Sequence, residues 1–156
     1  MLDKNKKYIL DGGSGQTLIE KGLIPKGSLW SATALIDKKL HYITQDGRVV
    51  FKFAVKGMAN VSAQILEQNG IASSSIDLYI PHQANKRIID GAAERCGFNK
   101  NQVFINIDRY GNTTAGTIPI CIDEAVEFGR LQDGNLLLIA AFGAGFTWGS
   151  MLIRWG

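Results

Sequence analysis

Segments with helical periodicity alternate with short apolar runs from residue 48 to the end of the chain, and this alternation constrains the fold most. The expected elements are, in order, a helix from about 48 to Asn69-Gly70, a strand at 76–80, a helix over 85–96, a strand at 102–106, a helix over 114–128, and strands at 136–142 and 146–155. This order predicts an α/β domain with a mixed sheet. The short Gly-rich turn between the last two strands predicts an antiparallel hairpin.

Composition limits the class of protein. The chain has 156 residues, 46% of them hydrophobic and 20% charged, which suits one globular domain. We expect no membrane span and no export signal, because no apolar run approaches ~20 residues and no apolar core follows the N-terminal lysines. A net charge of +3 is too small to indicate nucleic-acid binding. Two cysteines and two histidines form no disulfide framework or metal site, which favours a reducing, cytoplasmic setting.

The first candidate for chemistry is His82, which follows Pro81 at the carboxyl end of an expected strand. Open α/β sheets bind ligands at that end of their strands. Mostly polar residues follow the histidine, from Gln83 to Arg87, whereas a histidine in a strand core is flanked by apolar ones. The pattern alone leaves a functional and a structural interpretation of His82 open.

Two further turns carry groups that bind ligands. Asn112 lies in the Gly-flanked turn 110–116, where its amide offers a donor and an acceptor. Capping of the following helix by Asn112 or Thr113 is the alternative, and spacing alone favours it. The backbone N–H groups of the turn 143–145 are suited to an oxyanion, although a plain hairpin turn explains the same residues. Three such turns, each at a strand end, together predict a convergent site.

Neither cysteine suits a nucleophile. Cys96 belongs to the apolar stripe of its expected helix, and Cys121 lies among apolar residues in the middle of the next. A reactive thiol needs solvent access and a lowered pKa, and no serine lies in a G-x-S-x-G elbow. The chain therefore offers His82, Asn112 and an oxyanion turn without an evident nucleophile.

Three motifs cover these turns: Pro81-His-Gln-Ala-Asn-Lys-Arg-Ile88, Asp108-Arg-Tyr-Gly-Asn-Thr-Thr114 and Ala141-Phe-Gly-Ala-Gly-Phe-Thr-Trp-Gly149. In order and spacing they resemble the C-terminal half of β-ketoacyl-acyl-carrier-protein synthase III, the condensing enzyme that starts type II fatty-acid synthesis. The likeness runs from about His41 to Trp155. It implies the C-terminal half of a thiolase-like fold, with helices on a mixed, five-stranded type of sheet.

The resemblance also implies catalytic roles. His82 and Asn112 match the family's catalytic His and Asn, which hydrogen-bond the malonyl thioester carbonyl as decarboxylation places negative charge on it. Two neutral donors aimed at one developing oxyanion suit that need. Gly143, Ala144 and Gly145 match the family's oxyanion turn, in which the central residue is usually glycine.

For binding, Asn85 matches a contact to the pantetheine arm, and Arg87 matches a basic residue implicated in docking the acidic carrier protein. Some members carry a basic pair further along this helix, where this chain has Glu94 and Arg95. The implied substrates are acyl-CoA and malonyl-acyl-carrier protein, with no cofactor. The implied partners are the acyl carrier protein and either a complementary N-terminal half or a second copy in a homodimer.

The family's nucleophilic cysteine lies in its N-terminal half, in a Cys-Ser-Gly type of motif that this chain lacks. We therefore divide the chain into a poorly matched segment, 1–40, and a C-terminal domain of the synthase III type, 41–156. Residues 8–25 faintly resemble the start of a homocysteine S-methyltransferase.

Three interpretations stay open at this point. The first is the malonyl-activating half of a decarboxylating Claisen condensation, which is inactive by itself. The second is a non-catalytic module, or a truncated remnant, that binds carrier protein. The third is a methyltransferase relative, which depends on residues 8–25 alone. Zinc-dependent methyl transfer would need a Cys/His ligand set that the chain lacks.

Overall fold

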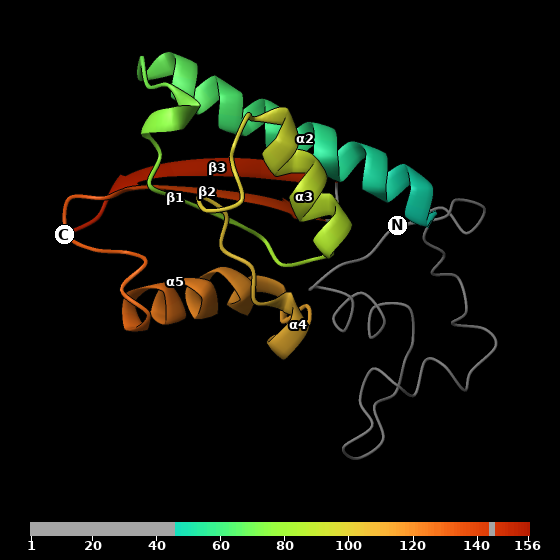
Figure 1. Cartoon of the computed structure of the whole chain (residues 1–156). Helices are drawn as coiled ribbons and strands as arrows, with labels where there is room; N and C mark the ends of the chain where they lie inside the picture. The colour runs from blue at the N-terminus through green and yellow to red at the C-terminus, as the bar shows by residue number, and fades with distance from the viewer. Residues whose placement is uncertain (1–45, 144–145) are drawn as a thin grey trace, which may run out of the picture. The chain divides into compact units, whose positions relative to one another are not determined.

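The structure is a computed structural model that describes residues 46–143 and 146–156 (Figure 1). The helices are α2 (Gly47–Gln68), α3 (Lys86–Arg95), α4 (Ile107–Tyr110) and α5 (Thr117–Glu127), with 3-10 turns η3 (Ser73–Ser75) and η4 (Thr114–Gly116). The strands are β1 (Leu78–Pro81), β2 (Leu136–Gly143) and β3 (Thr147–Arg154). The predicted alternation is confirmed except at 102–106. The predicted boundary at residue 40 lies outside the described residues.

The sheet is mixed, as predicted. β1 pairs in parallel with β2, and β2 pairs antiparallel with β3 along its full length. The hairpin prediction is therefore confirmed. The described residues contribute three strands, in the order β1-β2-β3, where the sequence suggested a five-stranded type of sheet.

The prediction of a strand at 102–106 is wrong. This segment makes a single parallel bridge, between Val103 and Tyr79. Side chains at its two ends make long-range hydrogen bonds. The Gln102 side chain turns back to donate to the Ile76 carbonyl at 2.6 Å, and Asn106 enters a buried polar network described below. The backbone of this segment makes two hydrogen bonds to Tyr79, one through the Gln102 carbonyl and one through the Phe104 N–H.

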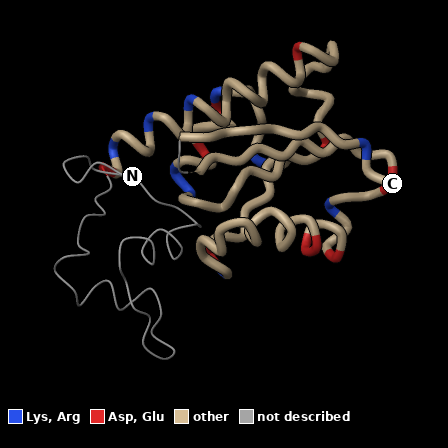
Figure 2. Tube along the Cα trace, turned by 180° about the vertical axis from the view of Figure 1, so that it is seen from behind, with Lys and Arg blue, Asp and Glu red and all other residues tan. Residues whose placement is uncertain are grey.

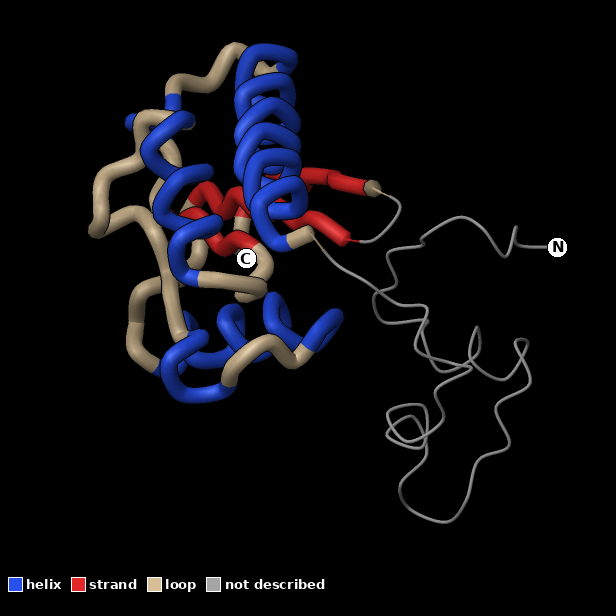
Figure 3. The backbone as a smooth tube through the Cα atoms, turned by 90° about the vertical axis from the view of Figure 1, so that its right-hand side faces the viewer, coloured by secondary structure: helices blue, strands red, loops and turns tan. Residues whose placement is uncertain are grey.

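Helices cover both faces of the sheet (Figures 1 and 3). α2 and α3 lie on one face, where their apolar residues form a core with Tyr79 and Leu138. α5 lies on the opposite face, where Cys121 packs with Leu78 and Ile80. Successive side chains of a strand point to opposite faces, so β1 contributes to both cores and is buried along its length.

α2 has one buried face, with buried positions recurring every four residues from Ala54 to Leu66. Val49 and Phe53, near the start of α2, are apolar, but 40% and 46% of their surfaces are exposed. Phe53 instead packs against the Phe146 ring at the tip of the hairpin, with 5.2 Å between ring centroids. The buried face of α2 therefore begins at Ala54, about two turns after the helix starts.

By length and composition alone, α2 is the one described helix that could cross a membrane. The core helix of a globular domain passes the same test. Here Met58 and Leu66 belong to the core beneath α2, which accounts for the apolar character of the helix.

Candidate active site

His82 lies where the sequence predicted, directly after β1. Its backbone N–H donates to the Ala140 carbonyl at 2.8 Å, which continues the pairing with β2 past Pro81. Its side chain is buried, and ring Nδ1 lies 2.6 Å from the hydroxyl oxygen of Thr117, the first residue of α5. His82 is thus held between the sheet, through its backbone, and α5, through its side chain.

Gln83 ties the His82 turn to the segment that leads to Asn112. This side chain is fully buried, and its Nε2 donates to the carbonyls of Pro81 at 2.7 Å and Phe104 at 3.3 Å. Its Oε1 accepts from the Asn106 backbone N–H at 3.1 Å. All hydrogen-bonding atoms of the Gln83 amide are therefore engaged, and the two turns are joined through them.

Asn112 follows α4 in a turn with unusual backbone geometry. Gly111 ends α4 with φ 67° and ψ −161°, and Thr114 has φ 53°. The Asn112 Oδ1 accepts from the Thr114 N–H at 2.9 Å, within the turn. The capping alternative is wrong, because Gly116 is the N-cap residue of α5 and the Thr113 side chain makes no cap hydrogen bond. Within the described residues the exposed Asn112 Nδ2 has no hydrogen-bond partner, which leaves it as a donor for a ligand.

A buried carboxylate on α5 anchors the segment before Asn112. Glu124 accepts from Asn106 Nδ2 and Tyr110 OH, both at 2.8 Å, and from Arg109 Nη2 at 2.5 Å. Burial by itself would raise the pKa of the Glu124 carboxyl, but these hydrogen bonds outweigh burial and the pKa lies below its ordinary value. The Cys121 thiol donates to Asn106 Oδ1 at 3.0 Å and completes the network.

The third predicted turn is described only at its start. Gly143 ends β2 opposite Thr147 of β3, whereas Ala144 and Gly145 lie outside the described residues. Because β1 and β2 run parallel, with Pro81 opposite Ala140, their carboxyl ends lie at the same edge of the sheet. The His82 turn and the start of the Gly143 turn are therefore neighbours.

The two predicted binding residues, Asn85 and Arg87, lie at the N-terminal end of α3. The Asn85 side chain caps this helix by accepting from the Arg87 backbone N–H at 2.9 Å. The Arg87 guanidinium lies over the Phe51 ring of α2, 5.3 Å from its centroid. Both residues are exposed, so they lie at the surface, Asn85 directly before α3 and Arg87 as its second residue.

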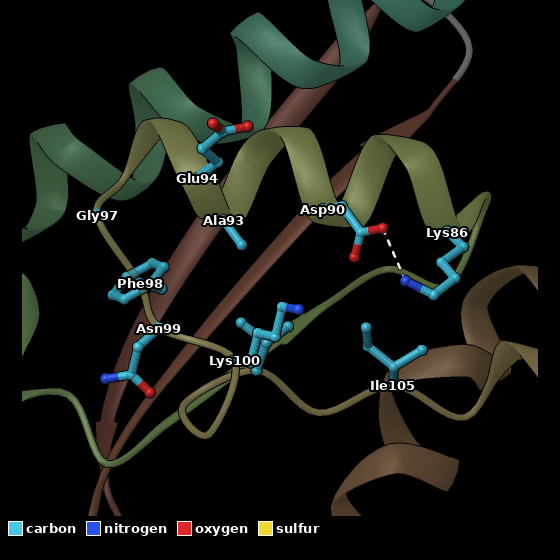
Figure 4. Close-up of a pocket in the computed structure, with 10 residues that line it drawn as sticks. Lys86, Asp90, Ala93, Glu94, Gly97, Phe98, Asn99, Lys100 and Ile105 are labelled. Carbon is cyan, nitrogen blue, oxygen red and sulfur yellow. Dashed lines mark hydrogen bonds and ion pairs between the residues drawn. The ribbon is translucent and has the colours of Figure 1, made fainter.

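An open groove of about 890 Å³ lies along the other side of α3 (Figure 4). Lys86, Asp90 and Glu94 line it from the helix, and Phe98, Lys100 and Val103 line it from the segment that follows. None of the predicted site residues lines this groove. It is therefore separate from the residues that the motifs single out.

Both thiols are unsuited to nucleophilic attack, as expected. Burial raises the pKa of Cys121 to about 12, and burial also raises the pKa of Cys96. Among the described residues, no group of three or more His, Cys, Asp or Glu side chains could hold a metal ion.

Residues 66–155 match the C-terminal domain of 3-oxoacyl-[acyl-carrier-protein] synthase III, which is more than half of the chain. The chain belongs to this family. The predicted resemblance to synthase III is thereby confirmed.

Close relatives carry the same family name. The β-ketoacyl-[acyl-carrier-protein] synthase III of Chlorobium luteolum is 50% identical over 147 residues, which cover 93% of this chain and 44% of the relative. That of Chlorobium phaeovibrioides is 49% identical over 153 residues, covering 97% and 45%. The chain thus spans less than half the length of these synthases. The longer alignment also includes residues 8–25, for which the sequence suggested a methyltransferase.

Solved structures of the family share this fold. The synthase III of Thermus thermophilus superposes with a TM-score of 0.70 at 45% identity, over 72% of this chain and 35% of that one. The enzyme from Aquifex aeolicus superposes with a TM-score of 0.71 at 46% identity, over 73% and 37%. The predicted fold class, a thiolase-like α/β half with a mixed sheet, is confirmed.

Sequence patterns did not single out three buried residues whose side chains contact the segments that carry the candidate site residues. Thr117 had a weak signal, as a hydroxyl residue near the start of an expected helix. Glu124 lies seven positions later on the buried face of the same helix. Charged residues are rare on such a face, so this position carries a signal in the sequence. No pattern indicates that Gln83 would bridge two turns.

Proposed function

We propose that this domain is the malonyl-activating half of a decarboxylating Claisen condensation at the start of fatty-acid synthesis. An acyl-cysteine thioester and malonyl-carrier protein would give 3-oxoacyl-carrier protein, CO₂ and the free thiol. Decarboxylation breaks the bond between the malonyl carboxylate and Cα, and the electron pair moves onto the thioester carbonyl oxygen. His82 and Asn112 donate hydrogen bonds to that oxygen. Membership of the synthase III family supports this assignment.

The second half of the reaction forms the new bond. The enolate carbon attacks the acyl carbon, and the backbone N–H groups of the turn 143–145 hold the resulting tetrahedral oxyanion. The carbonyl re-forms as the cysteine sulfur leaves as a thiolate, which then takes a proton. Decarboxylation thus supplies the carbanion without a separate strong base.

The observation that carries the proposal is the 2.6 Å contact between His82 Nδ1 and the Thr117 hydroxyl. When the hydroxyl donates to Nδ1, the ring proton resides on Nε2, and the neutral imidazole becomes a donor through that atom. Asn112 supplies the second neutral donor, because its Oδ1 is occupied by Thr114 while its Nδ2 keeps its donor capacity. Neutral donors stabilise an enolate oxygen without protonating it fully.

The acyl thioester must come from outside this domain. The pKa values of Cys96, which is partly buried, and Cys121, which is buried, are both raised by desolvation, so neither supplies the thiolate. We therefore expect the chain by itself to form no 3-oxoacyl product, and to form it when a cysteine-bearing N-terminal half is added. Condensation by the chain alone would contradict this proposal.

The decisive experiment mixes this chain with the separately produced N-terminal part of the Chlorobium luteolum relative. We expect His82→Ala and Asn112→Ala each to slow CO₂ release from malonyl-carrier protein by ~10²–10³. Acylation of the partner cysteine by acyl-CoA should survive in both variants. Asn60→Ala, at an exposed position on α2, is the matched control and should change neither step.

Equal loss of acylation and decarboxylation in both variants would contradict the assigned roles. Carrier binding without any decarboxylation in the mixture would favour the second interpretation, a non-catalytic carrier-binding module.

Docking of an acidic carrier protein is a further part of the proposal. Lys86 is ion-paired with Asp90 at 2.7 Å, whereas no acidic side chain of the described residues pairs with Arg87. Lys52 and Lys56 are exposed and lie about one helical turn apart on α2. Figure 2 shows several Lys and Arg positions along this helix. These cations favour an acidic partner at the start of α3.

Arg87→Glu should therefore weaken carrier binding, and Arg154→Glu, at the exposed end of β3 on the opposite edge of the sheet, should weaken it much less. Added salt should weaken wild-type binding, because exposed charges are screened beyond about 8 Å at 0.15 M. Salt-independent binding in calorimetry would count against this surface. A cytoplasmic location belongs to the same proposal, since both cysteines are free thiols.

A further inference from the structure

Glu124 is a buried acidic side chain to which the proposed chemistry assigns no role. We propose that it is a positioning residue, which holds the segment carrying Asn112 in register with His82. This inference rests on the proposed function, because it concerns the geometry between its two donors.

The contacts of Glu124 converge on the segment before Asn112. Only 7% of the Glu124 surface is exposed, and its carboxylate accepts three hydrogen bonds, from Asn106, Arg109 and Tyr110. Arg109 and Tyr110 are the last residues of α4, directly before Gly111 and Asn112. The carboxylate therefore fixes the base from which the Asn112 turn begins.

The same face of α5 also holds the histidine. Thr117, Cys121 and Glu124 are spaced i, i+4 and i+7, so they lie on one side of the helix, and all three are buried. Thr117 contacts His82 Nδ1, whereas Cys121 and Glu124 bind the two ends of the Asn106 amide. One helix therefore sets the position of both segments.

A second link joins the two segments through the backbone of Asn106. The Asn106 backbone N–H donates to Gln83, the residue after His82. Asn106 is thus held by Glu124 through its side chain and by the His82 turn through its backbone. Movement of the Asn106–Tyr110 segment would break contacts on both sides.

A purely stabilising role accounts poorly for this arrangement. Desolvating a carboxylate is costly, and buried ion pairs are weak evidence for stability compared with well-packed apolar residues. Charge-assisted hydrogen bonds are directional, however, and three of them on one carboxylate define the orientation of the groups that donate them. The network is therefore suited to fixing geometry at the site.

The test compares Glu124→Gln, which keeps the shape of the side chain, with Glu127→Gln, an exposed position on the same helix. Amide hydrogen exchange is measured on the full chain, and acylation and decarboxylation are measured after addition of the N-terminal half. In Glu124→Gln we expect exchange over 107–114 to rise roughly tenfold. Decarboxylation should fall by a similar factor, while acylation of the partner cysteine stays unchanged. Glu127→Gln should behave like the wild type.

Unchanged exchange and unchanged decarboxylation in Glu124→Gln would overturn the proposal. Equal loss of acylation and decarboxylation would also overturn it, because that pattern indicates general destabilisation. Should Glu124→Gln fail to fold, Tyr110→Phe removes one donor from a residue that is 47% exposed. It should give smaller changes in the same direction, and wild-type behaviour would count against the proposal.

The two proposals fail in different ways. If the wild-type mixture releases no CO₂, the proposed function is wrong. The exchange comparison still decides whether Glu124 holds the Asn112 segment, with faster exchange supporting that role and unchanged exchange overturning it.

Discussion

Replacing Gly111 with alanine should separate the geometry of Asn112 from the stability of the domain. Gly111 has φ 67° and ψ −161°, a backbone region that is essentially restricted to glycine. No heavy atom lies within 4 Å of the Cβ that alanine would add. The cost of Gly111→Ala is therefore backbone strain alone, with no steric clash.

The magnitude follows from that conformation. Strain of this kind costs about 1–3 kcal/mol, which lowers the Tm of a domain of this size by roughly 2–12 °C. The turn can relieve part of the strain by shifting Asn112, the next residue in the chain. Because a displacement of about 1 Å can cost ~10² in rate, we expect decarboxylation to fall by about 10–100-fold.

Gly70→Ala is the matched control. Gly70 has φ 63° and also has no heavy atom within 4 Å of an added Cβ, but it lies in the turn after α2. Thermal unfolding followed by circular dichroism should show both variants destabilised. CO₂ release from malonyl-carrier protein, measured with the N-terminal half present, should fall only in Gly111→Ala. Full decarboxylation by Gly111→Ala, or equal losses in the two variants, would refute the reasoning.

Three further predictions follow from single contacts. Thr117→Val should shift the His82 tautomer, measured by ring ¹⁵N NMR, and slow decarboxylation roughly tenfold. Thr117→Ser should retain the wild-type tautomer and rate. An unchanged tautomer in Thr117→Val would contradict the role given to the Thr117 hydroxyl. With a pKa of about 12, Cys121 should be about 10⁻⁴ thiolate at pH 8, so iodoacetamide should label it only after unfolding; rapid labelling by mass spectrometry would contradict the assignment. The lowered pKa of Glu124 contributes stability that is present above its ordinary value of 4.5 and is lost as pH falls through the folded-state pKa. In urea unfolding, the wild type should therefore lose more stability between pH 7 and pH 3.5 than Glu124→Gln does. Equal losses in the two proteins would contradict the lowered pKa.

The helices and most of the strands were predictable because their signals are local. The end of α2 is marked by Asn69-Gly70, and Gly70 has the positive φ expected of a helix stop. The strand that ends at Pro81 and the hairpin at the C-terminus follow from apolar runs bounded by turn residues. The segment 102–106 has the same local pattern but makes only one bridge, between Val103 and Tyr79, because strand pairing depends on neighbours that a local pattern does not specify.

The sequence by itself determined which residues stand at the strand ends, because hydrophobic periodicity and turn chemistry act over a few neighbouring positions. His82 was found in this way after β1, and Asn112 was found in a turn before a helix, although no strand precedes that turn. Only the tertiary structure decided what holds them: the contact between His82 and Thr117 joins residues 35 positions apart, and Glu124 reaches Asn106 across 18 positions. Such contacts depend on how α5 packs against the sheet. No local pattern encodes that packing, since it becomes defined only when distant apolar faces are buried together.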